Sequence, residues 1–328
     1  MKRKIQSYPR LDLARVKTYK LAQRKSKVEI QDFSRPHTPG SSFSDFLSTL
    51  PEILAARDFK AVISAVVQAQ QQDKMIIAGF GAHVFKVGLN PIIIDLMERG
   101  VLKAIALNGA GIIHDFELAL VGKTSEDVDR EINSGMFGMA EETGRILNTT
   151  ITNGVKQGTG IGEAVGKLIL SEKYPYKKMS VLAAGARLGI PISVHVSIGT
   201  DIIQMHPSFD GGATGQASLL DFRLLAHSVS RLEGGVYLNI GSAVLLPEVF
   251  LKAVTLARNL GHRLNRFTTV NMDFIQHYRP ITNVVKRPTQ QGGKGYMLTG
   301  HHEIMVPLLA AGIVEALEQN KKRRSYSP

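Results

Sequence analysis

An apolar run that stops at small, turn-forming residues and restarts at once constrains the fold of this chain most strongly. In ALNGAGIIHDFELAL (residues 106–120), the run ends at Asn108-Gly109-Ala110-Gly111, and the next apolar stretch carries His114 and Asp115. Asn and Gly tolerate the backbone angles of a tight corner. The pattern therefore predicts a strand that turns directly into a helix.

The same arrangement occurs before and after this segment. Gly79-Phe80-Gly81-Ala82 ends an earlier apolar run, and Asn239-Ile240-Gly241-Ser242 ends a later one. Longer stretches with helical periodicity lie between these runs. Strands that alternate with helices predict an α/β fold with a Rossmann-like, mostly parallel sheet and helices on both faces. Right-handed crossovers gather the strand ends at one edge of such a sheet, where ligands bind.

Three small-residue corners at one edge predict a cradle for a phosphate or a dinucleotide. None of them is a complete GxGxxG or Walker motif. The alternative for each corner is a tight turn with no ligand.

The segment SRPHTPGSS (residues 34–42) is rich in Pro, Gly and Ser and predicts a linker. We expect a basic N-terminal arm and linker over residues 1–42 and a single α/β nucleotide-binding domain over residues 43–328. Residues 1–27 hold ten Lys and Arg against one acid, a net charge of +9 of the +12 of the chain, and residues 321–324 add four cations. Such tails are typical of solvated arms, with nucleic-acid binding as the alternative.

Composition excludes several classes of chemistry. The chain has no Cys, which rules out disulfides, thiolate nucleophiles and Cys-ligated metals. His301-His302-Glu303 lacks the spacing of a zinc motif, so we expect no metal. No apolar run has the length of a membrane span, and no apolar segment typical of a signal peptide follows the basic N-terminus. We therefore expect a cytoplasmic protein without a membrane partner.

The order of several segments resembles the deoxyhypusine synthase family. They are GFGAHVFKVG, NGAGIIHDF, IGTDIIQMH, VYLNIGSAV, VNMDF, RPITNVVK and TGHHEIMVPLL, and together they span most of the chain, from about Lys74 to Leu309. The resemblance implies a homotetrameric, NAD-dependent transferase. In that family a hydride is removed from the polyamine spermidine, and its aminobutyl group passes to a lysine through an imine.

The resemblance also implies which residues form the site. Asp201 would lie at the substrate end, His301 would stand where the family has a carboxylate near the cofactor, and Lys286 would be the imine-forming lysine. The residues that would contact NAD are Gly81, Ala82, His83, Lys86, Asn108, Gly109, Ala110, His114, Gly241, Ser242, Asn271 and Met272.

Departures from the family pattern favour a different substrate. The family has a Trp-Gly pair before its catalytic lysine, whereas this chain has no Trp and places Val284-Val285 before Lys286. His114 and His301 replace carboxylates, which weakens the expected binding of a polycation. Two alternatives stay open: a different NAD-dependent reaction on a non-polyamine substrate, or a non-catalytic nucleotide-binding protein.

Two further features have two interpretations each. His195 in ISVHVSIG alternates with apolar residues, which indicates either a hydrogen-bonded core histidine or a wall of the site. The Gly-rich segment of residues 207–215 indicates either a flexible lid or an exposed loop.

Overall fold

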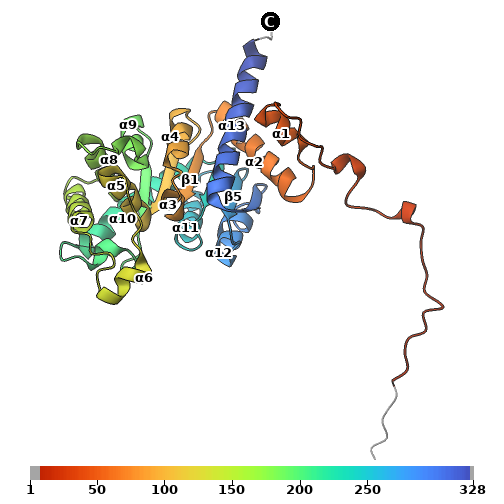
Figure 1. Cartoon of the computed structure of the whole chain (residues 1–328), viewed down its shortest axis with the longest axis horizontal. Helices are drawn as coiled ribbons and strands as arrows, with labels where there is room; N and C mark the ends of the chain where they lie inside the picture. Colours follow the sequence, from red (N-terminus) through yellow and green to blue (C-terminus); the bar gives the residue numbers. More distant parts are fainter. Residues whose placement is uncertain (1–7, 326–328) are drawn as a thin grey trace, which may run out of the picture.

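The computed structural model describes residues 8–325, those from 322 onward without their side chains. Residues 1–7 and the side chains of Lys322, Arg323 and Arg324, which belong to the predicted basic tails, lie outside the described part. Residues 8–42 form an arm that runs away from the body (Figure 1) and contains two short 3-10 turns, η1 (Leu21–Gln23) and η2 (Ile30–Asp32). In the described part, no helix is long and apolar enough to cross a membrane.

Six parallel strands form the centre of the fold, in the order β3-β2-β1-β4-β5-β6. The strands are β1 (Ile76–Phe80), β2 (Ala104–Asn108), β3 (Ile192–His195), β4 (Val236–Ile240), β5 (Thr268–Asp273) and β6 (Lys294–Thr299). The chain starts in the middle of the sheet, builds outward to β3, returns to the other side of β1 and builds outward to β6. The predicted α/β class, with a Rossmann-like parallel sheet, is confirmed by this order.

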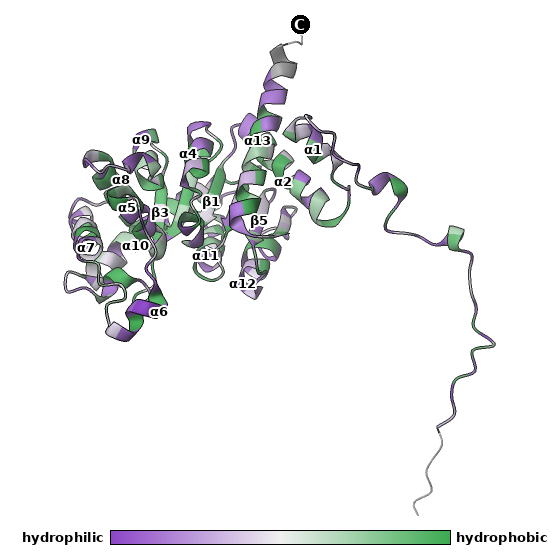
Figure 2. Cartoon of the chain, in the orientation of Figure 1, coloured by the Kyte–Doolittle hydropathy of each residue, from purple (hydrophilic) through white to green (hydrophobic). Residues whose placement is uncertain are grey.

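Helices cover both faces of the sheet, because strand residues point alternately to the two sides. Ile76, Ala78 and Phe80 join one buried cluster with residues of the helices over residues 54–71, 90–98, 109–121 and 302–325, whereas Ile77 joins the other with residues of the helices over 211–230 and 245–259. Apolar colouring dominates the strands in Figure 2, while the helices carry both colours. The longer helices are α1 (Phe43–Thr49), α2 (Leu54–Gln71), α4 (Asn90–Glu98), α5 (Gly109–Val121), α7 (Glu141–Lys156), α8 (Ile161–Ser171), α9 (Val181–Leu188), α10 (Gly211–Ser230), α11 (Leu245–Asn259) and α13 (His302–Ser325).

Short elements complete the connections. They are α3 (His83–Lys86), α6 (Val128–Glu131), η3 (Ile132–Ser134), η4 (Lys177–Met179), η5 (Ile202–Met205), α12 (Tyr278–Pro280) and the π-helical η6 (Ile281–Lys286). The Gly-rich segment after Pro207 is only partly a loop, because α10 already begins at Gly211. Asp210 caps this helix by accepting a hydrogen bond from the Ala213 N–H at 2.9 Å. The lid interpretation of residues 207–215 was therefore wrong for residues 211–215.

Candidate functional site

The corners after β1 and β4 meet at the point where the strand order reverses. The Gly81 N–H donates to the Ile240 carbonyl at 2.9 Å, and the Gly241 N–H donates to the Met272 carbonyl at 3.0 Å. A Cβ atom on Gly81 would collide with the carbonyl oxygen of Gly241. Gly241 itself has a φ of +71°, a backbone angle that residues with a side chain rarely adopt. Glycine is thus required on both sides of the seam between β1 and β4.

The corner after β2 is closed by two side chains. The Asn108 Oδ1 atom accepts the Gly111 N–H at 3.0 Å and caps α5. The Asp201 carboxylate lies so close to Gly109 that a Cβ there would collide with it. Burial raises the pKa of Asp201 to about 6, although a hydrogen bond from the Ala110 N–H opposes this shift. The structure thus brings Asp201, Asn108, Gly109 and Ala110 together at the start of α5.

Four aromatic or imidazole rings gather beside the β4 corner. His83 begins α3, Phe274 follows β5, and His301 and His302 follow β6. The Phe274 ring stacks on His301, with centroids 6.0 Å apart, and meets His302 edge-on at 5.6 Å. His83 lies 5.5 Å from His302, and its pKa is lowered by burial and by His302. We call this group the ring cluster.

His302 is the fully buried member of the ring cluster. Its ring approaches Gly241 so closely that a Cβ on the glycine would lie 2.9 Å from Cε1. Its side chain is 0% exposed, and neither ring nitrogen has a hydrogen-bond partner. The nearest carboxylate oxygen, Asp273 Oδ1, lies 3.5 Å from Nε2. His301, His302 and Glu303 together are candidate cofactor or substrate contacts in the sequence, and the resemblance assigns a role to His301 alone, because two adjacent histidines do not reveal which of them is buried.

Two predicted cofactor residues on β5 lie within the sheet. Asn271 receives a hydrogen bond from the Asn239 Nδ2 at 2.7 Å and donates to the Gln276 Oε1 at 2.7 Å. Asn239 also donates to the Ser242 carbonyl at 2.8 Å, which fixes the β4 corner. Met272 is fully buried in the core. Asn271 therefore holds the β4 corner in place through Asn239. Both Asn271 and Met272 are buried within the sheet.

His114 and Lys86 lie on the half of the site that follows β1 and β2. Lys86 ends α3, and His114 lies in α5. The His114 Nδ1 atom is 2.7 Å from the Thr124 Oγ1, and Thr124 in turn donates to Glu117 at 2.5 Å. Burial lowers the pKa of His114 to about 4, with a further contribution from the cation of Lys86. Lys86 is exposed at the end of α3. This half of the site therefore presents one exposed cation and a neutral imidazole.

Lys286 is not brought together with the other predicted residues. It is exposed at the end of η6, and the carbonyl of the preceding Val285 packs against Gly295 at the start of β6. The ring cluster lies beyond the opposite end of β6, about 16 Å along the strand. Lys286 thus belongs to the amino edge of the sheet, whereas the corners lie at the carboxyl edge.

Asp115, in the segment that opened the sequence analysis, caps a distant helix. It is fully buried and accepts hydrogen bonds from the Ser180 Oγ at 2.5 Å, the Val181 N–H at 2.8 Å and the Leu182 N–H at 3.1 Å. Asn90 donates a fourth at 2.9 Å. Burial raises its pKa to about 6, and these hydrogen bonds oppose the shift. Its carboxylate therefore anchors the start of α9 rather than a ligand.

Asp221 has the same role on the edge strand β3. One carboxylate oxygen accepts the Gly162 N–H at 3.0 Å, from the first turn of α8, and the Val194 N–H at 2.8 Å. His195 on this strand is buried, its Nε2 lies 3.0 Å from the Ser193 Oγ, and burial lowers its pKa to about 4. His195 is thus a hydrogen-bonded core residue.

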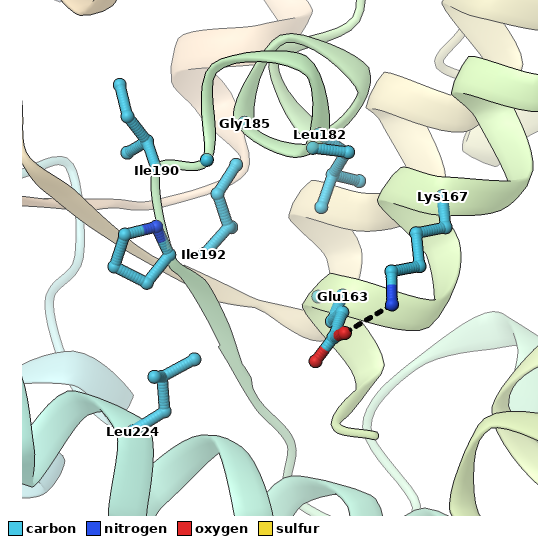
Figure 3. Close-up of a pocket in the computed structure, with 11 residues that line it drawn as sticks. Glu163, Lys167, Leu182, Gly185, Ile190, Ile192 and Leu224 are labelled. Carbon is cyan, nitrogen blue, oxygen red and sulfur yellow. Dashed lines mark hydrogen bonds and ion pairs between the residues drawn. The ribbon is translucent and has the colours of Figure 1, made fainter. Parts of the chain in front are cut away.

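A cavity of about 320 Å³ lies at the amino end of β3, away from the corners. Figure 3 shows Leu182, Ile190, Ile192 and Leu224 around it, with the ion pair of Glu163 and Lys167 at one side. The lining is mostly apolar. Within residues 8–325, no group of three His, Asp or Glu side chains could hold a metal ion.

Comparisons with known proteins support the fold. No protein-family profile matches the chain, and no curated protein matches it. A conserved protein of Methanococcus maripaludis S2, assigned to the LOR/SDH type, matches with a TM-score of 0.51 and 17% identity over 81% of this chain and 71% of that chain. The ternary complex of AgrE with ornithine and NAD+ matches with a TM-score of 0.50 and 16% identity over 81% of this chain and 34% of that chain.

A protein of Entamoeba histolytica assigned as a deoxyhypusine synthase matches with a TM-score of 0.46 and 11% identity, over 85% of this chain and 95% of that chain. At such low identities, the first two matches show that this chain shares a fold with the LOR/SDH-type protein and with part of AgrE.

Proposed function

We propose that the chain binds a dinucleotide of the NAD type across the seam between β1 and β4 and uses it in a reaction of a small amine. One observation carries this proposal: the corners of Gly81 and Gly241 meet where the strand order reverses. In open α/β sheets, ligands bind outside the carboxyl ends of the strands at this reversal. The N–H groups of Gly81 and Gly241 are bonded to the carbonyls of Ile240 and Met272, so a phosphate would meet the backbone N–H groups that follow each corner.

The residues at this edge fit such a ligand. Lys86 is an exposed cation in the first unit after β1, where a phosphate would lie. Asn108, at the end of β2, presents a side-chain amide where dinucleotide-binding folds place a ribose-binding group. On the other side of the seam, the Asn239 Oδ1 and both nitrogens of His302 are buried without partners. Buried polar atoms normally have partners, so a ligand is a reasonable source of the missing ones.

The known complex of AgrE supports the same ligand class. That protein, which shares the fold, was solved with ornithine and NAD+. Ornithine carries amines, and the resemblance to deoxyhypusine synthases also implies an amine. The resemblance assigns Asp201 to the substrate, but its carboxylate lies against Gly109 at the end of β2, on the half of the sheet that would hold the adenosine ribose. We therefore place the substrate amine beside the second half of the sheet, where NAD would supply a hydride acceptor.

The finer proposal of a homotetrameric polyamine transferase rests on the sequence resemblance alone. We do not route the reaction through Lys286 of the same chain, because this lysine lies at the opposite edge of the sheet from the corners. An amine oxidation without transfer to a lysine needs only groups at the carboxyl edge.

Calorimetric titration with NAD+ tests the proposal. We expect the wild-type chain to bind NAD+, and Lys86→Gln to bind it roughly tenfold more weakly, because a charge-assisted hydrogen bond to phosphate is lost. The exposed Lys294, at the amino end of β6, is the matched control, and Lys294→Gln should bind as tightly as the wild type. Formation of NADH after addition of ornithine or spermidine then identifies the substrate. A folded wild-type chain that binds neither NAD+ nor NADH would overturn the proposal.

A further inference from the structure

His302 differs from every other buried polar side chain of the described residues. Asn90, Asn148, Tyr237, Asn239 and Thr269 each leave one polar atom without a partner, whereas His302 leaves both ring nitrogens without one. Such a group loses its hydrogen bonds to water on folding and regains none, which costs stability. An arrangement of this kind calls for an explanation beyond packing.

Asp273 is the neighbour that can supply one of the two hydrogen bonds that His302 lacks. Asp273 Oδ1 lies 3.5 Å from Nε2, slightly beyond hydrogen-bond length, and it already accepts the Phe274 N–H at 2.8 Å. A small movement of the His302 ring toward Asp273 would form the bond. A neutral imidazole that donates its one N–H to a carboxylate has a free acceptor on the other nitrogen.

Phe274 is an exposed neighbour of His302 on the loop after β5. The residue is 45% exposed, and its ring contacts those of His83, His301 and His302. An exposed aromatic ring on the loop after β5 can turn away without disturbing the core. His302 contacts this ring edge-on and lies against Gly241, so the movement would open the buried imidazole toward the seam.

His302, Asp273 and Phe274 all belong to the second half of the sheet. In a dinucleotide-binding fold, each half of the sheet takes one mononucleotide, and the adenosine half is bound by the first unit, with its ribose group at the end of β2. The second half then faces the nicotinamide ring. The carboxamide of this ring has an NH2 group, which is the donor that a free imidazole nitrogen accepts.

We propose that His302, supported by Asp273 and uncovered when Phe274 turns away, accepts a hydrogen bond from the carboxamide of the nicotinamide ring. This inference rests on the proposed function, since it assumes a dinucleotide at the seam. It assigns His302 to recognition of the ring end of that ligand and leaves the phosphate and adenosine contacts to the first half of the sheet.

The variant His302→Phe tests this role, because it keeps a ring against Gly241 and removes only the two nitrogens. Titration with NAD+, with ADP-ribose, which lacks the nicotinamide ring, and with nicotinic acid adenine dinucleotide, which lacks the NH2 group, separates the contacts. We expect the variant to bind NAD+ roughly fivefold to tenfold more weakly than the wild type and the other two ligands equally well. The exposed His262, at the far end of α11, is the matched control, and His262→Phe should change no affinity.

Unchanged ADP-ribose binding also shows that the variant is folded, and its unfolding midpoint should be no lower than that of the wild type. Equal affinities of wild type and variant for NAD+, or an equal loss for all three ligands, would overturn the inference while leaving the proposed function in place. A wild-type chain that binds none of the three ligands would instead reject the proposed function, and the inference with it.

Discussion

Replacing Asp221 with Asn should change how the stability of the protein depends on pH. Asp221 is 1% exposed, and its carboxylate accepts N–H groups from the first turn of α8 and from β3. Burial raises its pKa to about 7, although hydrogen bonds from Gly162, Val194 and Ile161 oppose the shift. The variant keeps the size of the side chain and removes the ionisation.

The sign and size follow from the difference between the folded and unfolded pKa. Because the folded pKa is the higher one, the stabilising contribution of Asp221 is fully present below about pH 4, the unfolded value. It decreases as pH rises toward the folded value, since the unfolded chain releases its proton first. A shift from 3.8 to about 7 corresponds to a total loss of ~4 kcal/mol.

Urea unfolding of the wild type and of Asp221→Asn between about pH 4 and pH 8 measures this quantity. The free energy of unfolding of the wild type, minus that of the variant, should fall by ~4 kcal/mol across this window. Glu163→Gln, on the same turn of α8, is the control: Glu163 forms a half-exposed pair with Lys167, so its removal should change stability by under ~1 kcal/mol. A wild-type-minus-variant difference that stays constant with pH, or rises with it, would refute the reasoning.

Three further substitutions have outcomes that follow from single contacts. Gly241→Ala should destabilise the protein by ~1–3 kcal/mol in urea unfolding, because its φ is +71° and the new Cβ would lie 2.9 Å from His302; an unchanged midpoint would contradict this. Tyr237→Phe should be neutral or slightly stabilising in thermal unfolding, since the buried hydroxyl it removes has no partner, and a large loss would reveal one. Phe250→Ala should cost ~3–5 kcal/mol, because Phe250 is fully buried and stacks on Tyr237 with centroids 3.7 Å apart; a loss below ~1 kcal/mol would show that the core closes around the cavity.

The fold and its corners could be predicted from the sequence because their causes are local. A run of apolar residues that ends at Asn108-Gly109 specifies both the strand and the turn, and Asn108 does cap the helix that follows. The repetition of this unit was enough to predict a parallel sheet with its ligand edge at the corners. The strand order, which places Gly81 beside Gly241, depends on pairing between distant segments.

The roles of the charged residues could not be predicted, because each depends on a partner far along the chain. Asp115 bonds Ser180, and Asp221 bonds Gly162, so neither sequence neighbourhood contains the reason for the carboxylate. The resemblance implies a catalytic role for Lys286, whereas the crossover through η6 carries this lysine to the amino edge of the sheet. A motif fixes the order of residues along the chain but leaves open the edge of the sheet that each one reaches.

The pairing of β1 with β4 also determines when the protein can complete itself during synthesis. Ile76 and Val236 are paired partners, yet the ribosome adds all the residues between them before the second one emerges. Until then β1 has an open side, and the groove at its end does not exist. A nascent chain of this protein therefore passes through a long stage in which one side of its central strand lacks a partner, and contact with a chaperone would matter most in that interval.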